Sequence, residues 1–169
     1  MKPRSEGEDP VLTVAALEQV SLQVVRRHPL VVDPPYFADL TVPAHIASLA
    51  REHLFSDDAD RAVFFLDGSQ RLLAYSVLEP STPRAARDAL RTAIVHCARS
   101  LVVCSLRRSG GIVPQVDDYA LTRQMFQAGA VLGIPLYDHT IVAADEYCSF
   151  RELGWLDPSV AVDGWGLDT

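Results

Sequence analysis

The most constraining feature of this sequence is a series of short apolar runs, each bounded by turn residues. Runs of this length and composition are typical of strands that lie in the middle of a sheet. The predicted strands comprise residues 62–66, 71–78, 101–104, 135–143 and 147–150. Residues 67–70, which read Asp-Gly-Ser-Gln, predict a hairpin loop between the first two strands.

Segments in which apolar residues recur at helical spacing separate these runs. Helices are expected at about residues 10–27, from residue 43 onward, at 83–98 and at 118–132. The first of them follows Asp9-Pro10, an N-cap followed by proline, and ends before His28-Pro29. This alternation of strands and helices predicts an α/β sandwich.

Composition limits the class of protein. A chain of 169 residues of which 49% are apolar is long enough for one domain with a core and too apolar to be disordered. It contains no apolar run of the ~18 residues that a membrane span needs. Its acidic start does not resemble a secretory signal, so we expect a cytoplasmic protein. The three cysteines, Cys97, Cys104 and Cys148, lack metal-binding spacing and are expected to be reduced.

Charge is distributed unevenly along the chain. The net charge is −7, yet residues 61–108 hold eight arginines and three acidic residues. In this segment Arg84, Arg87 and Arg91 follow at helical spacing and form one stripe on the predicted helix. The stripe is either a solvated face or a contact for an anion or a partner, such as an acidic strip on a second copy of the chain.

Two motifs near the C-terminal end carry a family resemblance. Residues 132–142 read LGIPLYDHTIV, and residues 147–154 read YCSFRELG. They resemble the RadC-like JAB (MPN/JAMM) domain family, in which these positions read LGI-x-L-x-DH-x-IV and Y-x-SFRE-x-G. Upstream, FFLD at residues 64–67 and PRAARDAL at 83–90 are similar to the family's hairpin and helix.

The resemblance is collinear over residues 41–156. It implies a JAB/MPN-type domain with cytidine-deaminase-like architecture, in which helices flank a mixed β-sheet. Residues 1–40 then form an N-terminal tail and helix, and residues 157–169 form a C-terminal tail. Residues 1–40 are too few for the helix-hairpin-helix region that precedes the domain in RadC proteins, so we expect no counterpart of that region.

The family's chemistry depends on zinc held by His-x-His and an Asp, with a separate Glu as base and a Ser that stabilises the oxyanion. Three such ligands leave one coordination position for water, whose pKa the metal lowers. The family loop reads HNHPSGDPTPS-x-ED, and residues 105–118 read SLRRSGGIVPQVDD in the same register. The resemblance therefore places Ser105 and Arg107 at the histidine positions, Gln115 at the serine, Asp118 at the aspartate and Ala59 at the glutamate.

Asp118 is the one family ligand that remains, so we expect neither zinc nor another cofactor. A guanidinium does not coordinate metals, and we expect Arg107 to lie against Asp118 and to supply positive charge where zinc would bind. Cys104, His139 and Asp118 are an alternative metal site, although strand alternation turns Cys104 to the other face. We favour a structural hydrogen-bonding role for His139.

The leading functional hypothesis is a non-catalytic RadC-like JAB domain that binds or scaffolds a protein partner in bacterial DNA repair or recombination. A homodimer is expected because the MPN family pairs active with inactive copies. One alternative is a zinc-dependent isopeptidase or peptidase with a displaced ligand set. Another is nucleic-acid binding through arginines, and the candidate binding residues are Arg84, Arg87, Arg91, Arg107 and Arg108. Trp155 and Trp165 are expected to cover the edge of the core or an interface.

Overall fold

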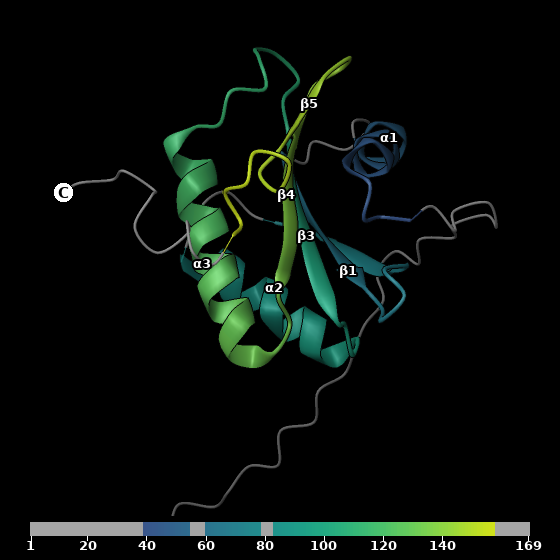
Figure 1. The fold of residues 1–169 in the computed structure, drawn as a ribbon, viewed down its shortest axis with the longest axis vertical. Coiled ribbons are helices and arrows are strands. Elements are labelled where there is room, and N and C mark those ends of the chain that lie inside the picture. The colour runs from purple at the N-terminus through teal and green to yellow at the C-terminus, as the bar shows by residue number, and fades with distance from the viewer. Residues whose placement is uncertain (1–38, 55–59, 79–82, 158–169) are drawn as a thin grey trace, which may run out of the picture.

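A computed structural model describes residues 39–54, 60–78 and 83–157 of the chain as helices packed on both faces of one sheet (Figure 1). The elements are α1 (Pro43–His53), β1 (Arg61–Leu66), β2 (Leu72–Val77), α2 (Pro83–Val95), β3 (Ser100–Leu106), α3 (Val116–Leu132), β4 (Leu136–Val142) and β5 (Tyr147–Ser149). The predicted helix at residues 10–27, the Ala59 position and the C-terminal tail from residue 158 lie outside the described residues.

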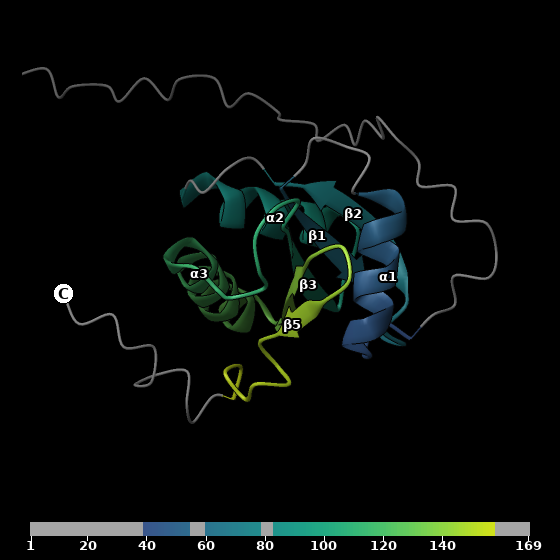
Figure 2. The ribbon, with the colours of Figure 1, turned by 90° about the horizontal axis from the view of Figure 1, so that it is seen from above.

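The sheet has the order β2-β1-β3-β4-β5. β3 and β4 run parallel, and the other neighbouring strands pair antiparallel. Seen from above, α2 and α3 cover one face and α1 covers the other (Figure 2). The prediction of a mixed sheet flanked by helices is therefore confirmed, as is the hairpin between β1 and β2.

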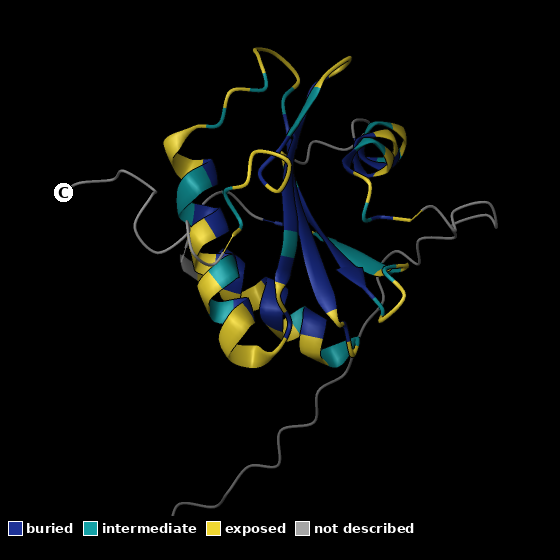
Figure 3. Ribbon diagram, in the orientation of Figure 1, coloured by how far each residue is buried: buried dark blue, intermediate teal, exposed yellow. Residues whose placement is uncertain are grey.

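Strand alternation divides the core into two clusters on opposite faces of the sheet. Val63 and Val103 belong to the cluster on the α2 and α3 side, whereas Phe64 and Cys104 belong to the cluster on the α1 side. Every residue of β3 is buried because the strand is central and both of its faces are covered (Figure 3).

The C-terminal motif makes a polar network that secures the turn after β5. The buried Asp138 accepts hydrogen bonds from the Ser149 hydroxyl at 2.6 Å and from the Arg151 backbone N–H at 3.0 Å. The Ser149 oxygen accepts in turn from the backbone N–H of Glu152 at 3.0 Å. The Arg151 guanidinium lies over the Tyr137 ring, 4.0 Å from its centroid. These motif residues therefore have structural partners.

Several boundaries differ from those predicted. β3 continues two residues further, to Leu106, because Ser105 pairs with Arg61 of β1 and Leu106 pairs with Val142 of β4. α3 begins two residues earlier, because Gln115 is extended and acts as its N-cap. α2 ends at Val95 rather than residue 98, and Cys97 just beyond it has a left-handed φ of 54°.

All three cysteines are free thiols in this structure: Cys104 is buried, Cys148 is half-buried and Cys97 is exposed. Among the described residues, no helix is both long enough and apolar enough to span a membrane.

α3 packs so closely on the chain that follows it that one position admits no side chain. A Cβ atom at Gly129 would lie 2.5 Å from the backbone oxygen of Ile134. The chain turns back sharply here because Gly133 has a φ of 69°, and the Ile134 N–H donates to the Gly129 carbonyl at 2.9 Å.

We predict that Gly129→Ala lowers the free energy of unfolding by about 1–3 kcal/mol, because the overlap involves backbone and outweighs the helix propensity of alanine. Urea denaturation measures the change. The control is Gly68→Ala, whose Cβ would meet only Arg99 Cγ at an ordinary 3.9 Å. A stabilised Gly129→Ala chain would contradict the predicted contact.

Candidate functional site

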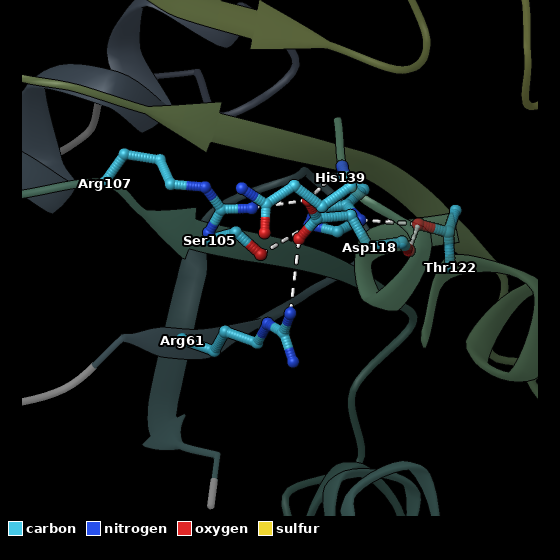
Figure 4. Close-up of polar contacts among 7 residues, drawn as sticks. Arg61, Ser105, Arg107, Asp118, Thr122 and His139 are labelled. Atoms are coloured by element: carbon cyan, nitrogen blue, oxygen red, sulfur yellow. Dashed lines mark hydrogen bonds and ion pairs between the residues drawn. The ribbon is translucent and has the colours of Figure 1, made fainter. Parts of the chain in front are cut away.

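The site centres on the carboxylate of Asp118, which lies in the first turn of α3 and is fully buried. One oxygen, Oδ2, accepts hydrogen bonds from Arg107 Nη2 and, at 2.8 Å, from the backbone N–H of Gln115. The other oxygen, Oδ1, lies 3.4 Å from Arg61 Nη2. Figure 4 shows the two guanidinium groups reaching this carboxylate, that of Arg61 from β1 and that of Arg107 from the residue after β3.

The sheet register explains why two arginines meet here. Arg61 opens β1 and lies opposite Ser105 of β3 in the antiparallel ladder, and Arg107 directly follows β3. Their side chains are only 11% and 13% exposed, so both charges are largely removed from water. The predicted pairing of Arg107 with Asp118 is confirmed.

Sequence reasoning missed Arg61. The sequence places Arg61 just before a predicted buried strand, but it does not show that β1 pairs with β3, and this pairing brings Arg61 to Asp118.

These contacts hold Asp118 in its charged form. Burial raises the pKa of the Asp118 carboxyl, but the hydrogen bond from the Gln115 backbone and the guanidinium of Arg107 outweigh it. The net result is a pKa below the ordinary value of an aspartate. The carboxylate is thus an anion whose oxygens are already bonded to groups of this chain.

A chain of hydrogen bonds behind Asp118 immobilises His139. Thr122 Oγ1 donates to the Asp118 carbonyl oxygen at 2.6 Å, so it accepts from His139 Nδ1 at 2.5 Å. His139 Nε2 then accepts from the hydroxyl of Ser105 at 2.8 Å. The imidazole also stacks on Phe150, with ring centroids 4.8 Å apart. The predicted hydrogen-bonding role of His139 is confirmed.

His139 is neutral in this setting. Burial lowers the pKa of the imidazole to about 3, and the nearby cations of Arg61 and Arg107 act in the same direction against the charge of Asp118. A serine hydroxyl bonded to a neutral imidazole is the arrangement of an activated nucleophile. Here, however, both Ser105 and His139 have an exposed fraction of 0%, so the hydroxyl has no access to a substrate.

The side chains of this site do not fit a zinc ion. The Ser105 hydroxyl is engaged by His139, the Arg107 guanidinium cannot coordinate a metal, and the oxygens of Asp118 are occupied. Cys104 lies in the cluster on the α1 face, so the alternative set of Cys104, His139 and Asp118 is not assembled. Within the described residues, no three His, Cys, Asp or Glu side chains are grouped to hold a metal.

The arginine stripe lies on a different element. Arg84, Arg87 and Arg91 are all exposed along α2, and Arg91 lies 3.4 Å from Asp88 one turn away. Arg108 is exposed in the loop before α3. The candidate binding arginines therefore comprise a largely buried one that serves Asp118, one exposed loop residue and an exposed helix face.

The fold, the C-terminal network and the comparisons define the class of protein. The family model of the RadC-like JAB domain matches residues 40–155, and the chain belongs to this family.

Several relatives of this chain are named UPF0758 protein. The chain is 31% identical over 127 residues to one from Picosynechococcus, which covers 73% of this chain and 49% of that protein. It is 27% identical over 154 residues to one from Microcystis aeruginosa, with 87% and 60% coverage. A Thermosynechococcus vestitus relative is 29% identical over 154 residues, with 87% and 59% coverage. The chain thus spans about half the length of the curated relatives it matches.

We predict that the neutral His139 makes the protein less stable in acid. Since its folded pKa lies near 3 and its unfolded value near 6.5, the unfolded state takes up the proton first as the pH falls. Protonation of His139 in the unfolded state therefore lowers the free energy of unfolding by about 2 kcal/mol between roughly pH 7.5 and pH 5.

The variant His139→Asn removes the contribution of His139 to the pH dependence of stability. Buried Asp138 has a raised pKa that acts in the opposite sense, and the lowered pKa of Asp118 acts only in stronger acid; both remain in the variant. Chemical denaturation across this pH range should give a shallower decline for the variant, although the variant is less stable at neutral pH. Equal slopes would contradict a neutral His139.

Removal of Arg107 should leave an under-compensated buried carboxylate. We predict that Arg107→Ala lowers the free energy of unfolding by about 3 kcal/mol. Adding Asp118→Asn to that variant should cost less than Asp118→Asn alone, because the unpaired charge is gone. The control is Arg123→Ala, at an exposed position of α3, which should change stability by less than about 0.5 kcal/mol. Equal effects of Arg107→Ala and Arg123→Ala would contradict the pairing.

Proposed function

We propose that this protein is a non-catalytic member of the RadC-like JAB family, which serves as a binding or scaffold module. The family's hydrolytic chemistry requires an open metal position and a base that activates water. In this chain Arg107 and the backbone of Gln115 bond to Asp118, and the hydroxyl of Ser105 bonds to His139.

The observation that carries the proposal is the ion pair between Arg107 and Asp118. A guanidinium on the one remaining family ligand supplies positive charge to that carboxylate and blocks its lone pairs at the same time. Arg61 adds a second cation on the other oxygen. The buried anion is therefore compensated without a metal, and a metal would have to displace both arginines to reach it.

The biological setting of the proposal comes from the family resemblance alone. RadC proteins imply bacterial DNA repair or recombination, and the partner would be another protein or a second copy of this chain. Two alternatives remain as competing hypotheses. A zinc-dependent peptidase needs a ligand set that the described residues do not assemble. Nucleic-acid binding has in its favour the exposed face of Arg84, Arg87 and Arg91 on α2.

Metal content tests the proposal. We predict that the chain, purified without chelators, holds less than stoichiometric zinc by elemental analysis. We also expect that excess EDTA leaves its thermal unfolding midpoint unchanged, because the charges of Asp118, Arg61 and Arg107 balance internally.

The enzyme alternative gives the opposite result. Stoichiometric zinc that is lost in Asp118→Ala, together with a midpoint that falls on addition of EDTA, would overturn the proposal. Asp117→Ala is the matched control, because Asp117 is the exposed neighbour of Asp118 in the first turn of α3.

A further inference from the structure

An apolar groove lies where the C-terminal parts of α2 and α3 pack together. It has a volume of about 450 Å³ and is lined by Arg87, Leu90, Arg91, Ile94, Val95 and Leu132. Figure 3 shows exposed surface along both helices at this end of the domain. Its lining is aliphatic except for the two arginines, which both come from the stripe on α2.

The groove is unusual in how much aliphatic surface it leaves in water. Ile94 is 54% exposed and Leu132 is 47% exposed, and the neighbouring Val131 is 87% exposed. Apolar area in contact with water costs roughly 25 cal/mol per Å² relative to burial, so a segment that covered these side chains would stabilise the protein.

We propose that residues 158–169 of this same chain occupy the groove. This segment reads PSVAVDGWGLDT, in which Val160, Val162, Trp165 and Leu167 alternate with small and acidic residues. It holds Asp163 and Asp168 and no basic residue. Its apolar side chains match the aliphatic walls, and its aspartates match the charge of Arg87 and Arg91.

The end of the described chain lies within reach of the groove. Leu156 packs against the core cluster that also contains Leu90, and the Trp155 ring lies 5.4 Å from that of Tyr119 in the first turns of α3. From Tyr119 to Leu132 a helix rises about 20 Å, whereas twelve extended residues span up to about 40 Å. The segment can therefore follow α3 to the groove with residues to spare.

The N-terminal segment is a poorer occupant. It joins the domain at Leu40, which belongs to the core cluster on the α1 face, across the sheet from the groove. Residues 1–38 also hold four basic residues, whereas residues 158–169 hold none. Like charges beside the two arginines of the groove oppose docking.

Residues 158–169 could occupy the groove whether or not the protein is an enzyme. Either proposal, the occupied groove or the non-catalytic function, can therefore be wrong without the other. Docking of residues 158–169 would neutralise part of the arginine stripe and cover its apolar neighbours. A partner that uses this face must then displace the chain's own segment, which makes the face a regulated one.

The test follows Trp165 in the full chain labelled with 5-fluorotryptophan. Its ¹⁹F resonance, assigned with Trp165→Phe, is measured against a soluble gadolinium chelate that relaxes exposed nuclei. We expect relaxation of Trp165 to increase severalfold in Ile94→Asp and in Arg87→Glu/Arg91→Glu, since the first disrupts the apolar wall and the second repels the aspartates. Arg123→Glu, which reverses an exposed charge on α3 outside the groove, should leave it unchanged.

The second tryptophan verifies that each variant is folded, because Trp155 packs on Phe150 with ring centroids 5.1 Å apart. A fully exposed Trp165 in the unaltered chain would overturn the proposal. Protection that both groove variants leave intact would also overturn it, since the segment would then lie elsewhere, as on the α1 face. If the protection of Trp165 disappears on dilution, the segment binds the groove of a second copy of the chain, and the proposal would be wrong.

Discussion

The buried carboxylate of Asp118 is the constraint around which this domain is organised. A charge taken out of water is tolerated only where donors and opposite charges surround it. Those partners come from three elements: Arg61 from β1, Arg107 from the end of β3 and the backbone of Gln115 from the start of α3. The strand register and the beginning of α3 are thus coupled through a single anion.

The backbone carbonyl of Asp118 also fixes the hydrogen bonds of the residues behind it. Thr122 donates to that carbonyl, which settles the tautomer of His139 and assigns the Ser105 hydroxyl as the donor at the other ring nitrogen. The hydroxyls of Thr122 and Ser105 and both ring nitrogens of His139 are therefore all hydrogen-bonded to groups of the protein. Ser105, Thr122 and His139 thus form a closed hydrogen-bonded arrangement in the core.

Much of this fold could be predicted from the sequence, because short apolar runs and turn residues act locally. The hairpin at residues 67–70 needed no knowledge of tertiary contacts, whereas the mixed sheet was expected from the family resemblance. The pairing of Arg107 with Asp118 could also be predicted, since a buried carboxylate needs a cation and the family register placed one nearby. The role of Arg61 could not, because it depends on which residue of β3 lies opposite it. Neither could the groove between α2 and α3, which arises from how two helices end beside each other.

The closed hydrogen-bonded chain from Ser105 to Asp118 has an evolutionary consequence. A single change of Arg107 to histidine would leave Arg61 and the Gln115 backbone on the carboxylate and would not create a coordination sphere. A single change at Ser105 would take the donor from His139 and place a larger group in a filled core. Each step taken alone loses stability before any metal affinity appears. A change from this arrangement to a metal-binding one would therefore require several substitutions together, because each one alone costs stability.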